Sequence, residues 1–290
     1  MTGVHTLLIA NRGEIARRVI RSARALGIRT VAVYSEPDAD APHVHDADLA
    51  VALGGRTSAE SYLQADAVVE AARRCGADAL HPGYGFLSEN AEFAEACDRA
   101  GITFVGPSPE SIRCMGLKDR AKEIARKAGV PVLPDGLIAG DNEHEWALEA
   151  RAVGFPLLVK ATAGGGGKGM RRVDRPEELA DAIAGARREA ANSFGDSTVF
   201  LERYLTRARH IEIQVFGDSH GHAVHLGERE CSIQRRHQKV LEESPSPAIT
   251  PQLRAEMGAT AVALVRELGY VGAGTVEYLL DEETGEFFFL

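Results

Sequence analysis

The sequence predicts a mixed protein, α/β in its first part and α+β in the remainder. Short apolar strands alternate with amphipathic helices over residues 1–116, which is typical of a doubly wound parallel sheet with helices on both faces. A run of glycines lies between Lys160 and Lys168, inside a segment of strands and one helix. Beyond residue 205, strands of alternating polarity are joined by tight turns, which favours an antiparallel domain.

Composition and charge restrict the function classes. The 290 residues suffice for about two domains, and 44% hydrophobic with 26% charged residues is typical of a globular protein. The net charge of -9 disfavours nucleic acid as a partner. No apolar run is long enough to span a membrane, so we expect a cytoplasmic protein without a membrane partner. Four separated cysteines are expected to be reduced thiols, namely Cys75, Cys97, Cys114 and Cys231.

The elements of the first domain follow from hydrophobic periodicity. Strands are predicted at 6–10, 29–35, 77–83 and 102–106. Helices are predicted from residue 13 to Gly27, then over 58–76 and 88–101. Ser108 is placed to cap a further helix that has Pro109 in its first turn. This pattern predicts one βαβ domain over residues 1–116.

The next two predicted domains cover 117–205 and 206–290. In the first of them, strands are expected at 155–162, 169–173 and 197–205, with a helix that Asp174 and Glu177 begin as a capping-box-like pair. In the second, strands surround a GDSHG turn, a helix covers about 250–268, and residues 273–290 form a hairpin.

The glycine run admits three interpretations as a phosphate-binding loop. A Walker loop is excluded because Lys168 is followed by Gly169 and not by Ser or Thr. The spacing of Gly164, Gly166 and Gly169 matches a dinucleotide fingerprint, but no helix starts there. A loop between two antiparallel strands remains, whose backbone N–H groups and lysines would hold a phosphate. A plain surface hairpin is the alternative.

Individual side chains also suggest ligands. Lys160 ends an apolar strand beside the glycines, where an ammonium group would be costly to bury without an anion. Glu277 lies among apolar residues of a strand, on the same side as Thr275 and Leu279, which suggests a metal ligand. For the lysines and histidines taken singly, solvated surface groups are the alternative.

Stretches spread over the whole chain resemble biotin carboxylase, an ATP-grasp enzyme found in the α chains of biotin-dependent acyl-CoA carboxylases and in pyruvate carboxylase. They are ANRGEIARRVIR, HPGYGFLSEN, MGLKDRAK, LVKATAGGGGKGM, RHIEIQVFGD, GERECSIQRRHQKVLEESPSP and GAGTVEY. The resemblance implies an ATP-grasp fold with an N-terminal biotin carboxylase domain (1–116), a linker helix and glycine-loop lid (117–205), and the first part of a C-terminal ATP-grasp domain (206–290).

The resemblance also implies roles for residues. ATP would be bound by Lys118, Lys160, Gly166, Gly167, Met170, Glu202, Arg203, Tyr204, Leu205, His210 and His237. Among these, Glu202 and the backbone of 203–205 would bind the adenine. Gln234, His237 and Lys239 would serve catalysis, with Lys239 binding bicarbonate. Glu277 would hold Mg²⁺ or Mn²⁺.

The implied reaction is MgATP-dependent carboxylation of protein-bound biotin by bicarbonate, through carboxyphosphate. Implied partners are a biotin carboxyl carrier domain and a carboxyltransferase β subunit, in a homodimer or larger complex. In the family, further metal and catalytic residues follow the position of Leu290. We therefore expect an N-terminal fragment of an acetyl- or propionyl-CoA carboxylase α chain of fatty acid metabolism, inactive by itself.

Two alternatives remain open at this stage. Another ATP-grasp ligase, such as a carbamoyl-phosphate-synthetase-like enzyme, would share the lid and the metal glutamates. A fragment that binds nucleotide or a partner subunit without catalysis is the other possibility. Dependence on biotin as the acceptor separates the first alternative from biotin carboxylase.

Overall fold

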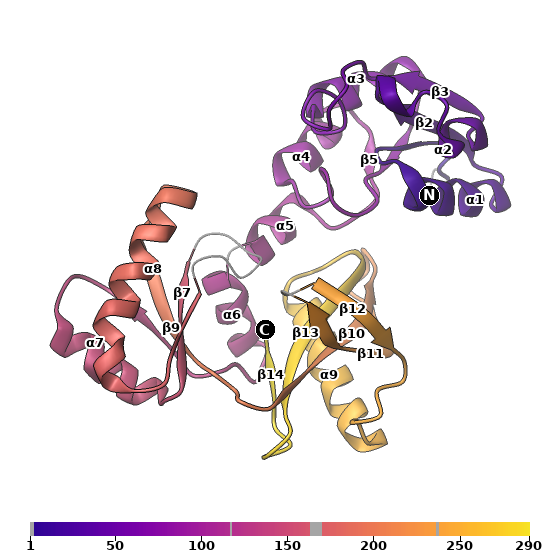
Figure 1. The fold of residues 1–290 in the computed structure, drawn as a ribbon. Helices are drawn as coiled ribbons and strands as arrows, with labels where there is room; N and C mark the ends of the chain where they lie inside the picture. Colours follow the sequence, from indigo (N-terminus) through magenta and orange to yellow (C-terminus); the bar gives the residue numbers. More distant parts are fainter. Residues whose placement is uncertain (1–2, 117, 163–169, 236–237) are drawn as a thin grey trace. The chain divides into compact units, whose positions relative to one another are not determined.

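A computed structural model describes residues 3–116, 118–162, 170–235 and 238–290 of the chain (Figure 1). The chain divides into two compact units, Met1–Gly116 and Leu117–Leu290. Each unit has its own sheets and its own hydrophobic core. The further division of the second unit after residue 205 stays a prediction.

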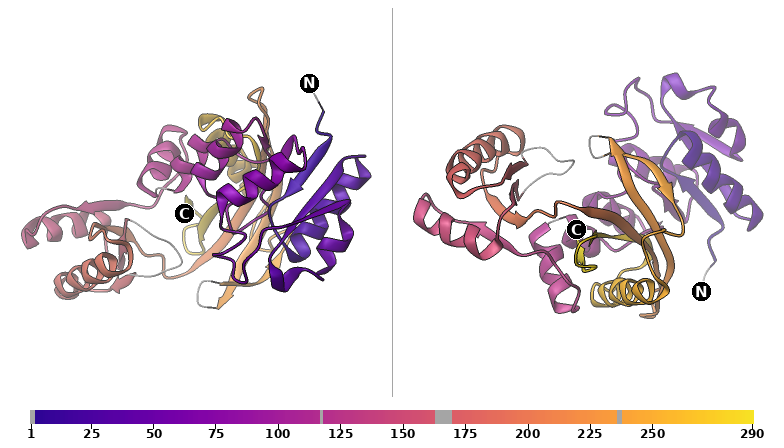
Figure 2. Two further views of the ribbon diagram at one scale, coloured as in Figure 1. Left: turned by 90° about the horizontal axis from the view of Figure 1, so that it is seen from above. Right: turned by 60° about the horizontal axis from the view of Figure 1, so that its bottom comes forward.

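The first unit is a parallel sheet with helices on both faces, as the sequence predicts (Figure 2). Its elements are β1 (Thr6–Ile9), α1 (Gly13–Ala25), β2 (Arg29–Tyr34), the 3-10 helix η1 (Glu36–Asp38), α2 (Pro42–Asp46), β3 (Leu49–Ala52), α3 (Ala65–Arg74), β4 (Ala79–His81), α4 (Ala91–Arg99), β5 (Thr103–Phe104) and α5 (Pro109–Gly116). The strand order is β3-β2-β1-β4-β5. Leu7 and Ile9 pack toward Ile20 of α1, whereas Leu8 packs toward Phe93 of α4.

Local chemistry accounts for the element boundaries in this unit. Ser108 Oγ accepts a hydrogen bond from Ser111 N at 3.2 Å, which confirms the predicted cap of α5. The helix predicted over 58–76 is shorter, because residues 58–64 form turns in which Ser61 Oγ donates to Thr57 O at 2.6 Å. Strand β3 was not predicted, since its short apolar run gives no clear periodicity.

The second unit begins with a linker helix and an antiparallel sheet. The elements are α6 (Lys118–Lys127), β6 (Asp135–Ile138), α7 (Glu143–Val153), β7 (Leu157–Ala161), β8 (Arg171–Val173), η2 (Pro176–Glu178), α8 (Leu179–Phe194) and β9 (Val199–Arg203). The strand order is β6-β9-β7-β8. Leu157, Val159 and Leu201 belong to a core shared with α7 and α8, so the alternate residues of β7 and β9 face away from those helices.

The start of the helical segment after β8 differs from the prediction. Glu178, not Glu177, reaches back, and its Oε2 accepts from Asp174 N at 3.1 Å. The 3-10 turn Pro176–Glu178 precedes α8 and moves the reciprocal contact by one residue. Strand β6 and helix α7 were also not predicted.

The rest of the unit is a second antiparallel sheet with α9 against one face. The elements are β10 (Ala208–Gly217), β11 (Ala223–Arg235), β12 (Gln238–Glu243), α9 (Pro251–Glu267), β13 (Gly272–Asp281) and β14 (Phe287–Phe289). The strand order is β12-β11-β10-β13-β14. The predicted helix at 250–268 and the final hairpin are confirmed. Ile211, Ile213 and Val215 are buried, so the alternate residues of β10 lie on the opposite face.

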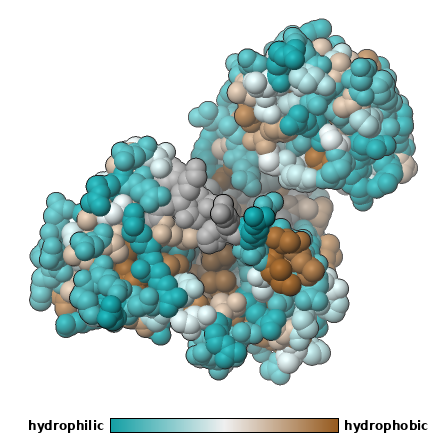
Figure 3. Space-filling model, viewed as in Figure 1, coloured by the Kyte–Doolittle hydropathy of each residue, from teal (hydrophilic) through white to brown (hydrophobic). Residues whose placement is uncertain are grey.

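The surface of this sheet is partly apolar. Figure 3 shows hydrophobic side chains gathered over the β11 and β12 ribbon. Exposed hydrophobic residues of these strands include Ile233, Val240 and Leu241. Among the helices of the described residues, none combines the length and the apolar character that a membrane crossing requires.

Candidate active site

Two glutamates form the centre of the candidate site on the β10–β13 sheet. Glu212 of β10 and Glu277 of β13 lie directly opposite each other in the antiparallel register. Like charges in that arrangement destabilise a sheet unless a counter-charge lies between them. Lys239 of β12 supplies it, because its Nζ donates to Glu212 Oε2 at 2.5 Å and to Glu277 Oε1 at 2.7 Å.

Glu212 is held by two cations. Arg229, its register partner on β11, donates to Glu212 Oε1, and also to Gln214 Oε1 at 3.1 Å. Burial by itself would raise the pKa of Glu212, but hydrogen bonds from Lys239 and Arg229 lower it below the ordinary value. Burial likewise opposes the charge of Lys239, yet the two carboxylates raise the pKa of its ammonium group. Both groups are therefore charged at neutral pH.

Among the described residues, one oxygen of Glu277 is not bridged by a lysine or arginine. Its Oε2 lies 3.6 Å from His210 Nε2, beyond hydrogen-bonding distance. The His210 ring beside this oxygen lowers the pKa of Glu277 most, Lys239 adds to this, and burial acts against it, so the pKa lies below its ordinary value. An ionised carboxylate with an available oxygen is the kind of donor that Mg²⁺ takes in proteins, so the residue fits the predicted metal.

Gln234 orients His210. The Gln234 Nε2 atom donates to Cys231 O at 2.8 Å, which identifies it as the amide nitrogen, since a carbonyl oxygen only accepts. The same nitrogen lies 2.7 Å from His210 Nδ1. His210 Nδ1 therefore accepts, and the ring proton lies on Nε2, which faces Glu277.

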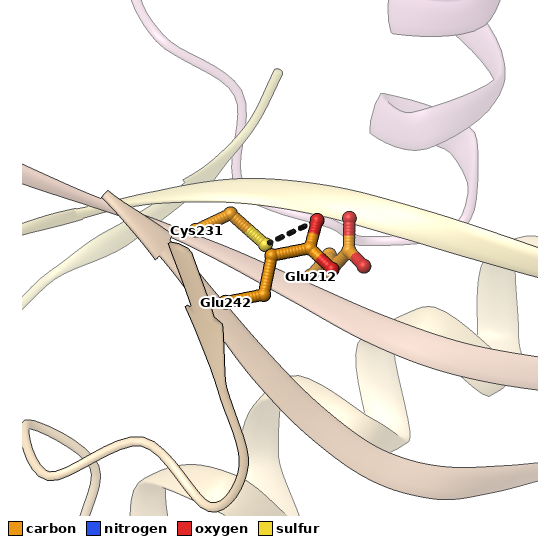
Figure 4. A group of neighbouring side chains, drawn as sticks. All are labelled: Glu212, Cys231 and Glu242. Atoms are coloured by element: carbon orange, nitrogen blue, oxygen red, sulfur yellow. Dashed lines mark hydrogen bonds between the residues drawn. The ribbon is translucent and has the colours of Figure 1, made fainter. Parts of the chain in front are cut away.

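Three side chains beside this site have the spacing of metal ligands, but internal hydrogen bonds and ion pairs account for them. Figure 4 shows Glu212, Cys231 and Glu242, whose ligand atoms lie within 4.8 Å of one another. The Cys231 thiol donates to Glu242 Oε1 at 3.7 Å, and burial followed by the Glu212 charge raises its pKa to about 12. A metal ion there would also be repelled by the Lys239 and Arg229 charges that already neutralise Glu212. We therefore assign no metal to this group.

A second cluster of charges lies on the β6–β9 sheet. Lys160 of β7 and Lys122 of α6 each donate to one oxygen of Glu202 on β9. Burial would raise the pKa of Glu202, but the charges of Lys160 and then Lys122 outweigh it and lower the pKa. Both oxygens of this carboxylate already bind lysines. Glu202 therefore positions the two lysines, in addition to its predicted contact with adenine.

The segment predicted to bind adenine is partly engaged within the protein. Arg203 N donates to Pro134 O and Tyr204 N donates to Pro156 O, both at 2.9 Å. The guanidinium of Arg172 lies 4.7 Å from the centre of the Tyr204 ring. The predicted roles of Arg203, Tyr204 and Leu205 stay predictions.

The structure brings many of the predicted residues together in two groups. His210, Gln234, Lys239 and Glu277 meet on the face of the second sheet away from α9. Lys160 meets Glu202 on the first sheet. Met170 lies just before β8 and is half-buried. Gly166, Gly167 and His237 lie outside the described residues, as does the side chain of Lys118.

Sequence reasoning missed Glu212, Arg229 and Lys122. Glu212 had a signal, because it interrupts the apolar strand IEIQV in the same way that Glu277 interrupts TVEYL. Arg229 becomes significant only through its register with Glu212. Lys122 had no signal, since it lies among other charged residues in the helix sequence KDRAKEIARK.

Two family models match the chain. Residues 3–112 match the N-terminal domain of biotin carboxylase, and residues 118–290 match the ATP-binding domain of the carbamoyl-phosphate synthase L chain. The mitochondrial methylcrotonoyl-CoA carboxylase subunit alpha of Oryza sativa subsp. japonica is 54% identical over 287 residues, which are 99% of this chain and 39% of that protein.

Two solved structures have the same fold as this chain. A biotin carboxylase from Campylobacter jejuni, in a complex named as beta-gamma-ATP, has a TM-score of 0.92 at 45% identity and is matched over 99% of this chain and 64% of its own. The biotin carboxylase domain dimer of a Hydrogenobacter thermophilus 2-oxoglutarate carboxylase, with MgADP, ADP and bicarbonate, has a TM-score of 0.90 at 46% identity, over 100% and 63%. This chain thus spans less than two thirds of each of these relatives. With a biotin carboxylase N-terminal domain followed by an ATP-grasp domain, the chain belongs to the biotin carboxylase family.

Proposed function

We propose that the protein to which this chain belongs uses MgATP to activate bicarbonate and transfers the carboxyl group to biotin. The observation that supports this most directly is the bridge of Lys239 between two ionised glutamates on the site face. A fixed cation there can bind an anion as small as bicarbonate while Glu212 and Glu277 hold the ammonium in place. The bicarbonate and MgADP named for the Hydrogenobacter thermophilus structure agree with this choice of ligands.

Each charged residue of the site would bind a different part of the substrates. Lys160 would bind a phosphate of the nucleotide, because its ammonium lies at the end of β7, before the glycine-rich segment. Lys239 would bind bicarbonate and stabilise the negative charge that develops on it during phosphoryl transfer. Mg²⁺, held by Glu277, would supply neutralisation of the phosphates when bound. Gln234 would keep the Nε2–H of His210 directed at Glu277.

Partners follow from the same proposal. The biotin would be carried on a biotin carboxyl carrier domain, and a carboxyltransferase β subunit would pass the carboxyl group to the final acceptor. Relatives named for methylcrotonoyl-CoA and for 2-oxoglutarate share 54% and 46% identity with this chain. Similarity of that order across two acceptors indicates that the acceptor, an acyl-CoA in our proposal, is chosen outside this part. We also propose a homodimer in the cytoplasm.

A second function is favoured by one observation. Residues 118–290 match the ATP-binding domain of the carbamoyl-phosphate synthase L chain, so a ligase that phosphorylates bicarbonate without biotin would use the same domain. Both reactions would begin with phosphorylation of bicarbonate, for which Lys239 and Glu277 would serve equally, and they differ in the acceptor of the carboxyl group. Dependence on biotin therefore decides between them.

The test measures ADP release from MgATP with and without bicarbonate and free biotin. It compares this chain with a chain extended to the full length of the biotin carboxylases that it matches. We expect turnover that needs both bicarbonate and biotin in the extended chain. Lys239→Gln should lower it at least about a hundredfold, which is typical for loss of one charge-stabilising donor.

The matched control is Lys127→Gln, because Lys127 is 60% exposed and pairs with Glu123 on the surface of α6. This variant should keep the wild-type rate. Turnover that needs bicarbonate but ignores biotin would favour the carbamoyl-phosphate-synthetase-like alternative. Turnover that ignores bicarbonate would contradict the proposal.

A further inference from the structure

A buried lysine outside the predicted site occupies a special position on the first antiparallel sheet. Asp135 of β6 and Glu202 of β9 lie directly opposite each other. Lys122 of α6 lies across this pair, because its Nζ donates to Glu202 Oε2 and, at 2.9 Å, to Asp135 Oδ2. The Phe200 ring, whose centre is 4.9 Å from Nζ, covers the same ammonium group.

Three side chains of this cluster are almost completely withdrawn from solvent. The side chains of Lys122, Glu202 and Lys160 are 7%, 6% and 11% exposed. Buried charges are stable only when they are paired, and an unpaired one costs several kcal/mol. The number of positive and negative groups therefore determines what further ion the cluster attracts.

The cluster contains more cations than carboxylates. The buried Lys122 and Lys160, together with Arg126 at the rim, whose side chain is 47% exposed, contact the two carboxylates of Asp135 and Glu202. Arg126 and Lys122 both contact Asp135, and Lys122 also contacts one oxygen of Glu202. The three cations thus face two negative charges. Among the described residues of the cluster, one positive charge is thus in excess, and Lys160 is the cation nearest the glycine-rich segment.

We propose that Lys122 is a positioning residue for nucleotide binding, which neutralises Glu202 so that Lys160 keeps its positive charge available to a phosphate. Lys122 does not itself touch the nucleotide in this proposal. It acts through Glu202: one oxygen of this carboxylate holds the Lys160 ammonium, and the other oxygen accepts from Lys122. This inference rests on the proposed function, because it assigns the Lys160 charge to the phosphates of MgATP.

Removal of Lys122 changes the charge of the cluster in a defined way. In Lys122→Met, Lys160 becomes the single lysine on a buried carboxylate, and the excess positive charge disappears. Phosphate binding should weaken, whereas the contacts of the base and ribose should remain. Neutralising Glu202 as well, in Lys122→Met/Glu202→Gln, restores the excess charge and should restore phosphate binding.

The experiment measures dissociation constants of MgATP, MgADP and adenosine by titration calorimetry. For Lys122→Met we expect MgATP and MgADP to bind about tenfold more weakly, the effect of one partly buried charge, with adenosine changed less than about twofold. Lys122→Arg keeps the positive charge although the larger side chain must be accommodated, so MgATP binding should weaken less than in Lys122→Met. The double variant should regain at least half of the lost free energy of MgATP binding.

Controls separate the inference from a general loss of structure. Lys127→Met removes an exposed lysine of the same helix and should leave all three dissociation constants unchanged. Equal weakening of adenosine and MgATP in Lys122→Met would show a merely structural role and overturn the inference. Unchanged MgATP binding in that variant would overturn it too. These titrations use the chain extended to the full length of the biotin carboxylases that it matches, and a wild-type extended chain that binds no MgATP would instead contradict the proposed function, and the inference with it.

Discussion

At the scale of the residue, both antiparallel sheets of the second unit use the same device. Each places two carboxylates directly opposite each other and spans them with a lysine from a third element: Lys122 over Asp135 and Glu202, and Lys239 over Glu212 and Glu277. A lysine ammonium has three donors, so it can bind two carboxylates at once. This arrangement fixes Lys239 where bicarbonate would bind, and it fixes Glu202, which holds Lys160 where a phosphate would bind.

Stability should depend on Glu202 through its buried charge. Glu202→Gln leaves Lys122 with one carboxylate and Lys160 with none, and we expect a loss of about 3–5 kcal/mol in the free energy of unfolding at neutral pH. The pKa of Glu202 is lowered from its ordinary value of 4.5 by the two lysines, against the effect of burial. The carboxylate therefore stabilises the fold above pH 4.5, and this contribution is lost as the pH falls through the lower pKa of the folded state.

Urea unfolding at several pH values measures this difference. The gap between wild type and Glu202→Gln should be largest at neutral pH and should shrink below pH 4.5. Glu177→Gln is a control, since the Glu177 side chain is 65% exposed, and its effect should be small at every pH. A gap that stays constant with pH would show that the charge of Glu202 does not stabilise the fold.

The residues of the site were predictable from the sequence only in part. Glu277 and Lys160 stand out because a charged residue interrupts or ends an apolar strand. Lys122 does not, because its helix is rich in charges and burial depends on packing against β9. A pairing such as Glu212 with Arg229 depends on strand register, which the sequence of either strand leaves open.

At the scale of the element, hydrophobic pattern identified most helices and strands, and it missed β3, β6 and α7. Helix α9 is 17 residues long and begins with the capping Thr250 followed by Pro251, the β13–β14 hairpin is closed by turn residues, and both were predicted. Strands β3 and β6 form through pairing with a neighbouring strand, β2 for β3 and β9 for β6, which the sequence of either segment does not reveal. The first turn of α8 shifted by one residue because a 3-10 turn precedes the helix.

Helix α9 lies so close to β11 at Gly258 that alanine, normally the better helix former, should be unfavourable there. Replacing glycine by alanine inside a helix usually stabilises it by about 1 kcal/mol. A Cβ on Gly258 would lie 2.5 Å from His225 Cε1, which is too close for a real contact. Gly258→Ala should therefore destabilise the protein by about 1–3 kcal/mol, as overpacking does.

A double-mutant cycle measures that contact. In a His225→Ala background, Gly258→Ala should cost less than about 0.5 kcal/mol or stabilise the helix, because the ring is absent. Urea unfolding of the four proteins gives the coupling free energy. Equal costs of Gly258→Ala in both backgrounds would show that the helix and strand adjust without strain.

At the scale of the whole molecule, the two units have separate cores. The described core clusters of Met1–Gly116 contain no residue of the second unit, and the cluster built on α7, α8 and β7 lies entirely in Leu117–Leu290. The two family models meet near the same boundary, since they match residues 3–112 and 118–290. Separate cores are the usual condition for domains that fold independently.

The residues that we propose to bind nucleotide, including Lys160, Glu202 and Glu277, all belong to the second unit. A protein of residues 117–290 should therefore fold by itself and bind MgADP within about threefold of the whole chain, whereas residues 1–116 should bind none. Circular dichroism checks the folding of each piece, and titration calorimetry measures the dissociation constant. If residues 117–290 fold but bind MgADP more than about tenfold more weakly, the first unit must contribute to nucleotide binding. Matching affinities would instead assign the nucleotide site to the ATP-grasp part alone and leave bicarbonate and biotin as the ligands through which the first unit could act.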